Sequence, residues 1–212
     1  MHSKKRWLVF VLISGLSMLT LFFSGPERSF FLRRMIQQPR LVGSIAPSSK
    51  SLAQLMLREA LMVVKNSDDF VVEIGPGTGC ITRVILDHGI AAERLICVEM
   101  DTALHQYMTE QFPDVNIIQG DAVDLATILP EKRGKIAVIV SGVPLKNLSL
   151  EKEKKIIQAC CTMLRPDGKL IQFTYGVRPP AAVIGLRRKF IGFALFNLPP
   201  AFVWSFIKVG IP

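Results

Sequence analysis

The stretch Phe70-Val71-Val72-Glu73-Ile74-Gly75-Pro76-Gly77-Thr78-Gly79-Cys80 places three apolar residues before an acid, and then three glycines at alternate positions. An apolar run of this length is typical of a strand that is buried on both faces of a parallel sheet. Glycines let the backbone turn sharply and approach a ligand closely, because they carry no Cβ. Residues 81–86 have a helical pattern, and the first turn of a helix offers N–H groups to an anionic ligand. The stretch therefore predicts a strand, a ligand-binding turn and a helix.

The spacing of the glycines indicates which ligand this turn binds. A dinucleotide-binding turn has the pattern G-x-G-x-x-G, which requires glycine where this chain has Cys80. The pattern present, acid-x-G-x-G-x-G, resembles the cofactor loop of class I S-adenosylmethionine-dependent methyltransferases. The resemblance implies that S-adenosylmethionine is the cofactor and that its methionine part is surrounded by Glu73, Gly75, Gly77 and Gly79. A glycine-rich turn without a ligand is the alternative.

The length and the distribution of charge predict one acidic domain with basic segments on both sides. The 212 residues suffice for one well-buried domain and an appendage. The net charge of +9 is unevenly spread, with an excess of basic residues in 1–65 and 175–212 and an excess of acidic ones in 66–174. Basic flanks indicate an anionic partner, either a membrane surface or a nucleic acid, although a solvated basic face is the alternative. The 4 cysteines show no metal-binding spacing and are predicted to be reduced thiols, so we expect no metal.

The N-terminus has the composition of a membrane segment. Residues 7–23 contain no charge and follow three basic residues, which is close to the shortest length for a membrane-spanning helix, about 17 residues. No small-residue cleavage site follows. We predict that residues 1–26 form an uncleaved membrane anchor. Residues 28–38 then have the pattern of a short basic amphipathic helix, suited either to a membrane interface or to packing on the domain.

Strand patterns recur along the rest of the chain, at residues 70–74, 94–99, 115–122, 136–140 and 169–176. Helices are predicted before the first strand, at residues 50–65 (capped by Ser48 or Ser49), and between later strands, at 81–86 and 151–164, with a turn at 165–168. After the basic residues 187–189, two apolar runs, 190–196 and 201–208, surround an Asn-Leu-Pro-Pro turn and indicate a hairpin. The predicted fold is α/β and Rossmann-like: a mostly parallel seven-stranded sheet with a C-terminal antiparallel hairpin, preceded by a membrane segment.

Polar residues follow several of these strands, and the class I resemblance gives them roles. It implies that Glu99 binds the ribose hydroxyls and that Asp121 holds the adenine amino group. Met100 and Ala122, which directly follow these two acids, join the cofactor-binding set. Ser141, at the end of the fourth strand, faces the methyl group that is transferred.

Several phrases resemble a narrower family, the bacterial phospholipid N-methyltransferases. These phrases are Arg-Leu-Val-Gly-Ser-Ile-Ala-Pro-Ser-Ser at 40–49, Ser-Gly-Val-Pro-Leu at 141–145, Gln-Phe-Thr-Tyr-Gly at 172–176 and Asn-Leu-Pro-Pro-Ala at 197–201. Val143 departs mildly, since leucine is typical of that family there. The resemblance implies methylation of phosphatidylethanolamine towards phosphatidylcholine. It also implies that residues 27–66 form a leader and helix covering the cofactor, with residues 67–212 as the methyltransferase domain.

Two rival functions stay open. The related ribosomal RNA adenine dimethyltransferases share the core and would suit the basic flanks. They usually have an aromatic residue after the proline of the fourth-strand loop, on which the flipped base stacks, whereas Leu145 follows Pro144 here. We therefore do not expect nucleic acid as the partner. A cofactor-binding membrane protein without turnover is the second rival.

The predicted acceptor site centres on Tyr175. Together with Ser141 it is our candidate catalytic residue, holding the head-group amine by a hydrogen bond and, once methylated, by a cation–π contact; a core aromatic is the alternative for Tyr175. Arg178 or Lys50 would meet the lipid phosphate, unless they are simply solvated charges. The expected partners are phosphatidylethanolamine, its methylated intermediates and an anionic membrane surface. The expected location is a bacterial inner membrane, with the catalytic domain on the cytoplasmic side.

Overall fold

A computed structural model of the chain describes residues 49–209, except 67, 196, 198 and 199. The chain divides into two units, Met1–Gly43 and Ser44–Pro212, and the description below concerns the second. The predicted anchor at 1–26, the amphipathic helix at 28–38 and the leader before Ser49 lie outside the described residues. Within the described residues, no helix is both long and apolar enough to cross a membrane.

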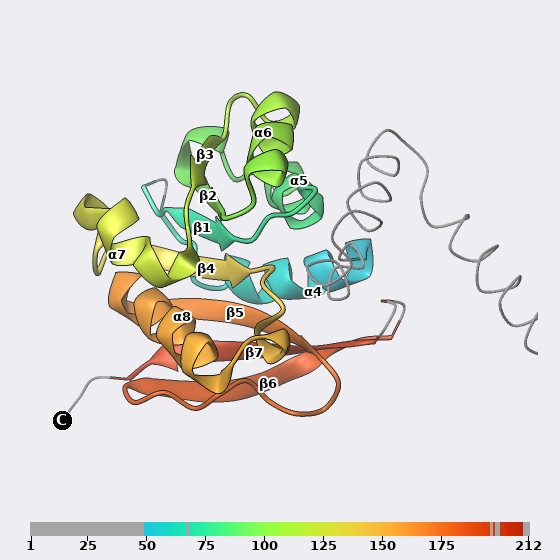
Figure 1. Cartoon of the computed structure of the whole chain (residues 1–212), viewed down its shortest axis with the longest axis vertical. Coiled ribbons are helices and arrows are strands. Elements are labelled where there is room, and N and C mark those ends of the chain that lie inside the picture. Colours follow the sequence, from blue (N-terminus) through green and yellow to red (C-terminus); the bar gives the residue numbers. More distant parts are fainter. Residues whose placement is uncertain (1–48, 67, 196, 198–199, 210–212) are drawn as a thin grey trace, which may run out of the picture. The chain divides into compact units, whose positions relative to one another are not determined.

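The domain is built on one seven-stranded sheet with the strand order β3-β2-β1-β4-β5-β7-β6 (Figure 1). Strands β1 to β5 are parallel, and β7 runs antiparallel to both β5 and β6. This confirms the predicted sheet and its C-terminal hairpin. The strands are β1 (Val71–Ile74), β2 (Leu95–Glu99), β3 (Asn116–Gln119), β4 (Ile136–Ser141), β5 (Leu164–Tyr175), β6 (Leu186–Ala194) and β7 (Ala201–Lys208).

Helices cover both faces of this sheet. They are α4 (Lys50–Leu61), α5 (Cys80–Asp87), α6 (Thr102–Gln111), α7 (Leu125–Ile128) and α8 (Leu150–Met163), with short 3-10 turns η1 (Ala92–Arg94), η2 (Ala122–Asp124), η3 (Pro130–Lys132) and η4 (Leu145–Asn147). Val71 belongs to a core with α4, α5 and α6, whereas its neighbour Val72 belongs to a second core with α7 and α8. Because successive side chains of a strand point to opposite faces, unbroken apolar runs are needed here.

The helix before β1 begins as predicted and ends early. Ser49 caps it, since its Oγ accepts the N–H of Leu52 at 3.2 Å. The helix ends at Leu61, four residues before the predicted end. Beyond that point the carbonyl of Val63 accepts a hydrogen bond from the guanidinium of Arg165, at 2.9 Å. A tertiary contact thus ends the helix before its apolar pattern does.

Two local predictions near β5 and β6 were wrong. Residues 165–168, predicted as a turn, are part of β5, where the pairing with β4 jumps from Ile136↔Leu164 to Val138↔Lys169. The extra residues form an irregularity within the strand, because Leu164 already pairs with β4 before them. Likewise, residues 187–189 do not precede the hairpin but lie inside β6, paired with β7.

Candidate functional site

The strands β1 to β5 all end at one edge of the sheet, which we call the carboxyl edge. Ile74, the last residue of β1, is in register with Val98 of β2 and Ser141 of β4. The turns after β1 and β4 touch, because the Gly142 N–H donates to the Ile74 carbonyl at 2.8 Å. A Cβ at Gly142 would lie 2.3 Å from the Gly75 carbonyl oxygen, so this contact requires glycine. In open parallel sheets, ligands bind at the carboxyl ends of the strands.

Glu73 is completely buried beneath the glycine turn. Its Oε2 accepts hydrogen bonds from the Thr82 hydroxyl at 2.6 Å and the Cys97 thiol at 3.7 Å. Its Oε1 is buried with no hydrogen-bond partner among the described residues. Burial raises the pKa of Glu73 to about 7, against the lowering effect of these hydrogen bonds. An oxygen of this kind fits a cationic partner such as the ammonium group of an amino-acid ligand.

The turn above Glu73 leaves room for a ligand. Gly77 has a φ of +61°, and a Cβ placed there would meet no atom of the described residues within 4 Å. The Gly77 N–H donates to Glu99 Oε2 at 3.1 Å, and the Asp101 N–H donates to Glu99 Oε1 at 2.9 Å. The carboxylate at the end of β2 is thus held at both oxygens beside the turn. Burial raises the pKa of Glu99, although the backbone hydrogen bonds oppose this.

The next three predicted cofactor residues also lie at this edge. Met100 is largely exposed directly after β2, and Ala122 is buried in η2 after β3. Asp121 caps η2 through the Val123 N–H at 3.1 Å, and its other oxygen pairs with Lys152 of α8 at 2.8 Å. Burial raises the pKa of Asp121, but the hydrogen bond and charge of Lys152 outweigh this and lower it. The carboxylate is therefore ionised and already shared with a lysine that sequence reasoning did not connect to it.

Ser141 is buried at the end of β4, where its Oγ accepts the Val143 N–H at 3.3 Å. The same loop is held from β5, because the Gln172 side-chain amide donates to the Val143 carbonyl at 2.9 Å. The Gln172 Oε1 is buried and has no partner among the described residues. Sequence reasoning placed Ser141 at this edge but assigned Gln172 no role, although Gln172 lies in a phrase that it singled out.

Tyr175 ends β5 at the carboxyl edge, half-buried, with its ring edge-on to Phe173 at 5.1 Å between centroids. Burial raises the pKa of Tyr175, and a hydrogen bond from the Asn197 side chain opposes this. Asn197 Oδ1 in turn accepts the Ser49 N–H at 2.8 Å. This chain of contacts brings the exposed Lys50, the first residue of α4, to the Tyr175 side of the edge.

The remaining predicted substrate residue, Arg178, is exposed in the segment between β5 and β6. The structure therefore gathers the predicted cofactor residues at the ends of β1 to β4, and places the predicted acceptor residues next to them, around the end of β5. Among the described residues, no group of three or more His, Cys, Asp or Glu side chains is placed to hold a metal ion.

Comparison with known proteins agrees with this arrangement. Residues 71–168 match the sequence family described as a methyltransferase domain. An ornithine lipid N-methyltransferase from Singulisphaera acidiphila is 29% identical over 180 residues, which cover 81% of this chain and 91% of that protein. A ribosomal RNA small subunit methyltransferase A from Chlorobium chlorochromatii is 31% identical over 77 residues, covering 36% of this chain and 28% of that protein.

Among solved structures, an S-adenosylmethionine-dependent methyltransferase from Archaeoglobus fulgidus superposes with a TM-score of 0.59 at 14% identity, covering 84% of this chain and 99% of that one. The fold is the Rossmann-like fold of class I methyltransferases, and the domain is an S-adenosylmethionine-dependent methyltransferase domain. The predicted cofactor is confirmed. The unpartnered Glu73 Oε1 and the open turn at Gly77 fit its amino-acid part, and the anchored Glu99 carboxylate fits its ribose.

Proposed function

We propose that this protein methylates the head-group amine of a membrane lipid, converting phosphatidylethanolamine towards phosphatidylcholine at the cytoplasmic side of a bacterial inner membrane. The observation that carries the proposal is the match to a protein named as a lipid N-methyltransferase, which extends over 91% of that protein and 81% of this chain. A match of this extent reaches well beyond the cofactor turn.

The geometry around Tyr175 supports an amine as the acceptor. Its raised pKa keeps the hydroxyl neutral near pH 7, so that its oxygen accepts a hydrogen bond from an incoming amine without forming a fixed ion pair. Asn197 fixes the position of that hydroxyl. The ring would also stabilise the positive charge that develops on the nitrogen during each methyl transfer, through a cation–π contact.

S-adenosylmethionine, when bound, supplies an electrophilic methyl group on a sulfonium. The new bond forms between the amine nitrogen and the methyl carbon while the carbon–sulfur bond breaks. The residues of the chain have to align these atoms and exclude water. The acceptor amine attacks through its lone pair, so it has to lose its ammonium proton first, which the half-buried surroundings of Tyr175 favour by lowering an amine pKa.

A ribosomal RNA adenine methyltransferase is the second candidate, supported by the match to a ribosomal RNA small subunit methyltransferase over about a third of this chain. The loop after β4 speaks against it. Leu145 stands where a base-stacking aromatic is expected, and it is fully buried in the core shared with α8. A protein that binds the cofactor without turnover is the third candidate.

One experiment separates the three candidates. The full-length chain is incubated with methyl-radiolabelled S-adenosylmethionine and either vesicles of phosphatidylethanolamine and phosphatidylglycerol or ribosomal RNA, with Gly77→Val as the inactive control. We expect label in the lipid extract, co-migrating with N-methylated phosphatidylethanolamine. Label in RNA would establish the second candidate. Cofactor binding by calorimetry with no label in either acceptor would establish the third.

A further inference from the structure

The C-terminal hairpin carries an exposed aromatic surface. Among the described residues, β6 is the outermost strand of the sheet (Figure 1), and no other described strand pairs with its outer side. Phe190 contacts Trp204 at 5.1 Å and Phe202 at 6.3 Å between ring centroids, and Phe193 contacts Phe202 at 6.4 Å. We call these four rings, together with Leu195, the hairpin patch. Phe190 is 46% exposed, Phe193 54% and Leu195 64%, whereas residues of this kind are usually buried.

The hairpin patch reaches the same edge of the sheet as the acceptor side of the site. In the sheet register, Phe202 of β7 pairs with Thr174 of β5, and Ala201 pairs with Tyr175. The Trp204 indole N–H donates to the Thr174 hydroxyl at 3.0 Å. The end of the patch at Phe193 and Leu195 is therefore at the carboxyl edge, with β7 between it and β5. Its rings lie on the face of the sheet that carries Thr174, and Tyr175 points to the other face at the same edge. A lipid whose acyl chains contact this end would present its head group at the edge along which Tyr175 lies.

Basic residues lie behind this apolar tip. Arg187 and Lys189 are exposed on β6, and the Arg188 guanidinium lies 5.7 Å from the Trp204 ring centroid while donating to the Pro180 carbonyl. A strand rises about 3.3 Å per residue, so Lys189 is roughly 13 Å further from the edge than Phe193. Residues 175–212 contain five basic residues and no acid. The hairpin thus has an apolar tip at the carboxyl edge and basic residues further along β6.

We propose that the hairpin patch is a membrane-docking surface for anionic bilayers, in addition to the proposed lipid N-methylation on which this inference rests. The tip residues Phe193 and Leu195 enter the acyl region, Trp204 lies at the interface, and Arg187 and Lys189 meet anionic head groups. Residues 191–195 at the tip carry no charge, whereas the basic residues 187–189 lie further from the edge. An uncharged apolar tip favours a bilayer over single-stranded RNA, for which aromatic and basic side chains are interleaved along one groove. Docking in this orientation brings the carboxyl edge to the head-group layer.

Photolabelling tests the docking surface directly. The full-length chain is bound to vesicles of phosphatidylethanolamine and phosphatidylglycerol that contain a lipid with a diazirine on its acyl chain. After irradiation, mass spectrometry locates the adducts. We expect at least tenfold more adducts in residues 190–195 than at Ile184, which is 89% exposed but precedes β6 at the opposite edge of the sheet. Equal labelling at Ile184, or labelling outside the hairpin patch only, would overturn the proposal.

Matched variants add a second readout. The double variant Phe193→Ser/Leu195→Ser should reduce adducts at Phe190 at least fivefold, whereas Ile184→Ser should leave them unchanged. Arg187→Gln/Lys189→Gln keeps all the rings and should reduce labelling only on anionic vesicles, and less in high salt. Cooperative thermal unfolding checks that each variant is folded, and a loss of labelling counts only for folded variants.

Other occupants and a failure of the proposed function give different results. Cross-links between two chains at Phe190 or Phe193, or cross-links there to photoreactive RNA in place of lipid, would overturn the proposal. Labelling needs no methyl transfer, so a labelled hairpin patch with no methylated lipid would uphold docking and reject lipid methylation. Methylated lipid without labelling of the patch would do the reverse.

Discussion

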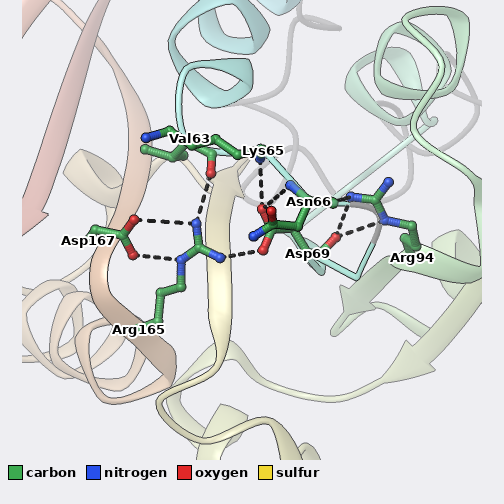
Figure 2. Close-up of polar contacts among 7 residues, drawn as sticks. All are labelled: Val63, Lys65, Asn66, Asp69, Arg94, Arg165 and Asp167. Carbon is green, nitrogen blue, oxygen red and sulfur yellow. Dashed lines mark hydrogen bonds and ion pairs between the residues drawn. The ribbon is translucent and has the colours of Figure 1, made fainter.

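Buried acidic residues at the two ends of the parallel strands differ in how completely their carboxylate oxygens are hydrogen-bonded. At the amino ends of the strands, Asp69 is buried with a partner for each oxygen: Oδ2 accepts the N–H groups of Lys65 and Asn66 at 2.8 and 3.0 Å, and Oδ1 pairs with Arg165 (Figure 2). The Asp69 carbonyl accepts two hydrogen bonds from the Arg94 side chain. At the carboxyl ends, Glu73 is completely buried but keeps one oxygen without a partner among the described residues. The first arrangement joins three segments of the fold, and the second leaves capacity for a ligand.

The pKa directions express the same difference. Burial raises the pKa of Asp69, but its backbone hydrogen bonds and Arg165 outweigh this and lower it. At Glu73 burial dominates and the pKa rises to about 7. Buried acids with strongly perturbed pKa values and incomplete hydrogen bonding are typical of functional sites. The comparison therefore predicts that substitutions at the amino edge change stability, and that those at the carboxyl edge change binding and catalysis.

The largest effect is expected from Arg165→Met at the amino edge. It leaves the Asp69 carboxylate buried without its cationic partner, and breaking a buried pair in this way costs about 3–5 kcal/mol. We expect the free energy of unfolding in urea to fall by that amount. Cofactor affinity of the folded fraction, measured by calorimetry, should stay within twofold.

Arg94→Met is the matched control, because Arg94 reaches the same cluster through backbone carbonyls only. Its loss should cost about 1 kcal/mol. An equal loss of unfolding free energy in the two variants would show that the charge of Asp69 does not determine the stability of this edge.

Gly77→Val should cause the next largest effect, a loss of cofactor affinity of at least a thousandfold, or about 4 kcal/mol. The side chain would project into the open space above the turn. Gly89→Val is the matched control, since Gly89 also has a positive φ (+84°) and open space around its Cβ, but follows the C-cap of α5. Both variants should lose similar stability through backbone strain. Calorimetry would contradict the assignment if both variants bound the cofactor equally well.

Glu73→Gln should change the pH dependence of stability. The raised pKa of Glu73 contributes stability below its ordinary value of 4.5, and this contribution is lost as pH rises through about 7. The variant should match the wild type near pH 4.5 and exceed it at pH 8, by on the order of 3 kcal/mol at 1.36 kcal/mol per unit. Urea unfolding without cofactor at the two pH values measures this difference.

Asp69→Asn gives the contrasting sign at the other edge. The lowered pKa of Asp69 contributes stability above its ordinary value of 3.8, which is lost as pH falls through the folded value. This variant should be less stable than the wild type at pH 8, and the difference should close in acid. The same sign for both variants would remove the electrostatic distinction between the edges.

The carboxyl edge was more predictable from the sequence than the amino edge. The glycine turn and the acids after β1, β2 and β3 lie within short, periodic segments, so local pattern and resemblance placed them. Asp69 and Arg165 are 96 positions apart, and nothing in their local sequence marks them as a pair. The predicted turn at 165–168 failed for a related reason, because pairing with β4 decides the conformation of a segment whose composition favours a turn.

The hydrogen-bond and ion-pair partners of the site residues could not be predicted from local sequence patterns either. Thr82 and Cys97 hold Glu73, and Lys152 pairs with Asp121, through contacts between different elements. Lysines on a helix usually face solvent, so the run of charged residues 151–155 did not indicate that Lys152 pairs with Asp121. Asn197 could have been singled out from the sequence, since it lies in the Asn-Leu-Pro-Pro phrase. Its contacts with Tyr175 and Ser49 explain why an asparagine suits that turn.

The smallest effect concerns the acceptor end of the carboxyl edge. Tyr175→Phe removes the hydroxyl that the Asn197 side chain fixes but keeps the ring against Phe173. One hydrogen bond is worth about 1 kcal/mol, so kcat/KM for vesicle-borne phosphatidylethanolamine should fall about fivefold while the KM for S-adenosylmethionine stays unchanged. Tyr175→Leu also removes the ring, so it should impair most the last methylation, whose quaternary product carries a permanent positive charge. Tyr107→Phe in α6 removes the chain's other tyrosine hydroxyl and should leave kcat/KM unchanged. If Tyr175→Phe left kcat/KM unchanged as well, Tyr175 would be a packing residue, and the acceptor would have to bind elsewhere along the edge.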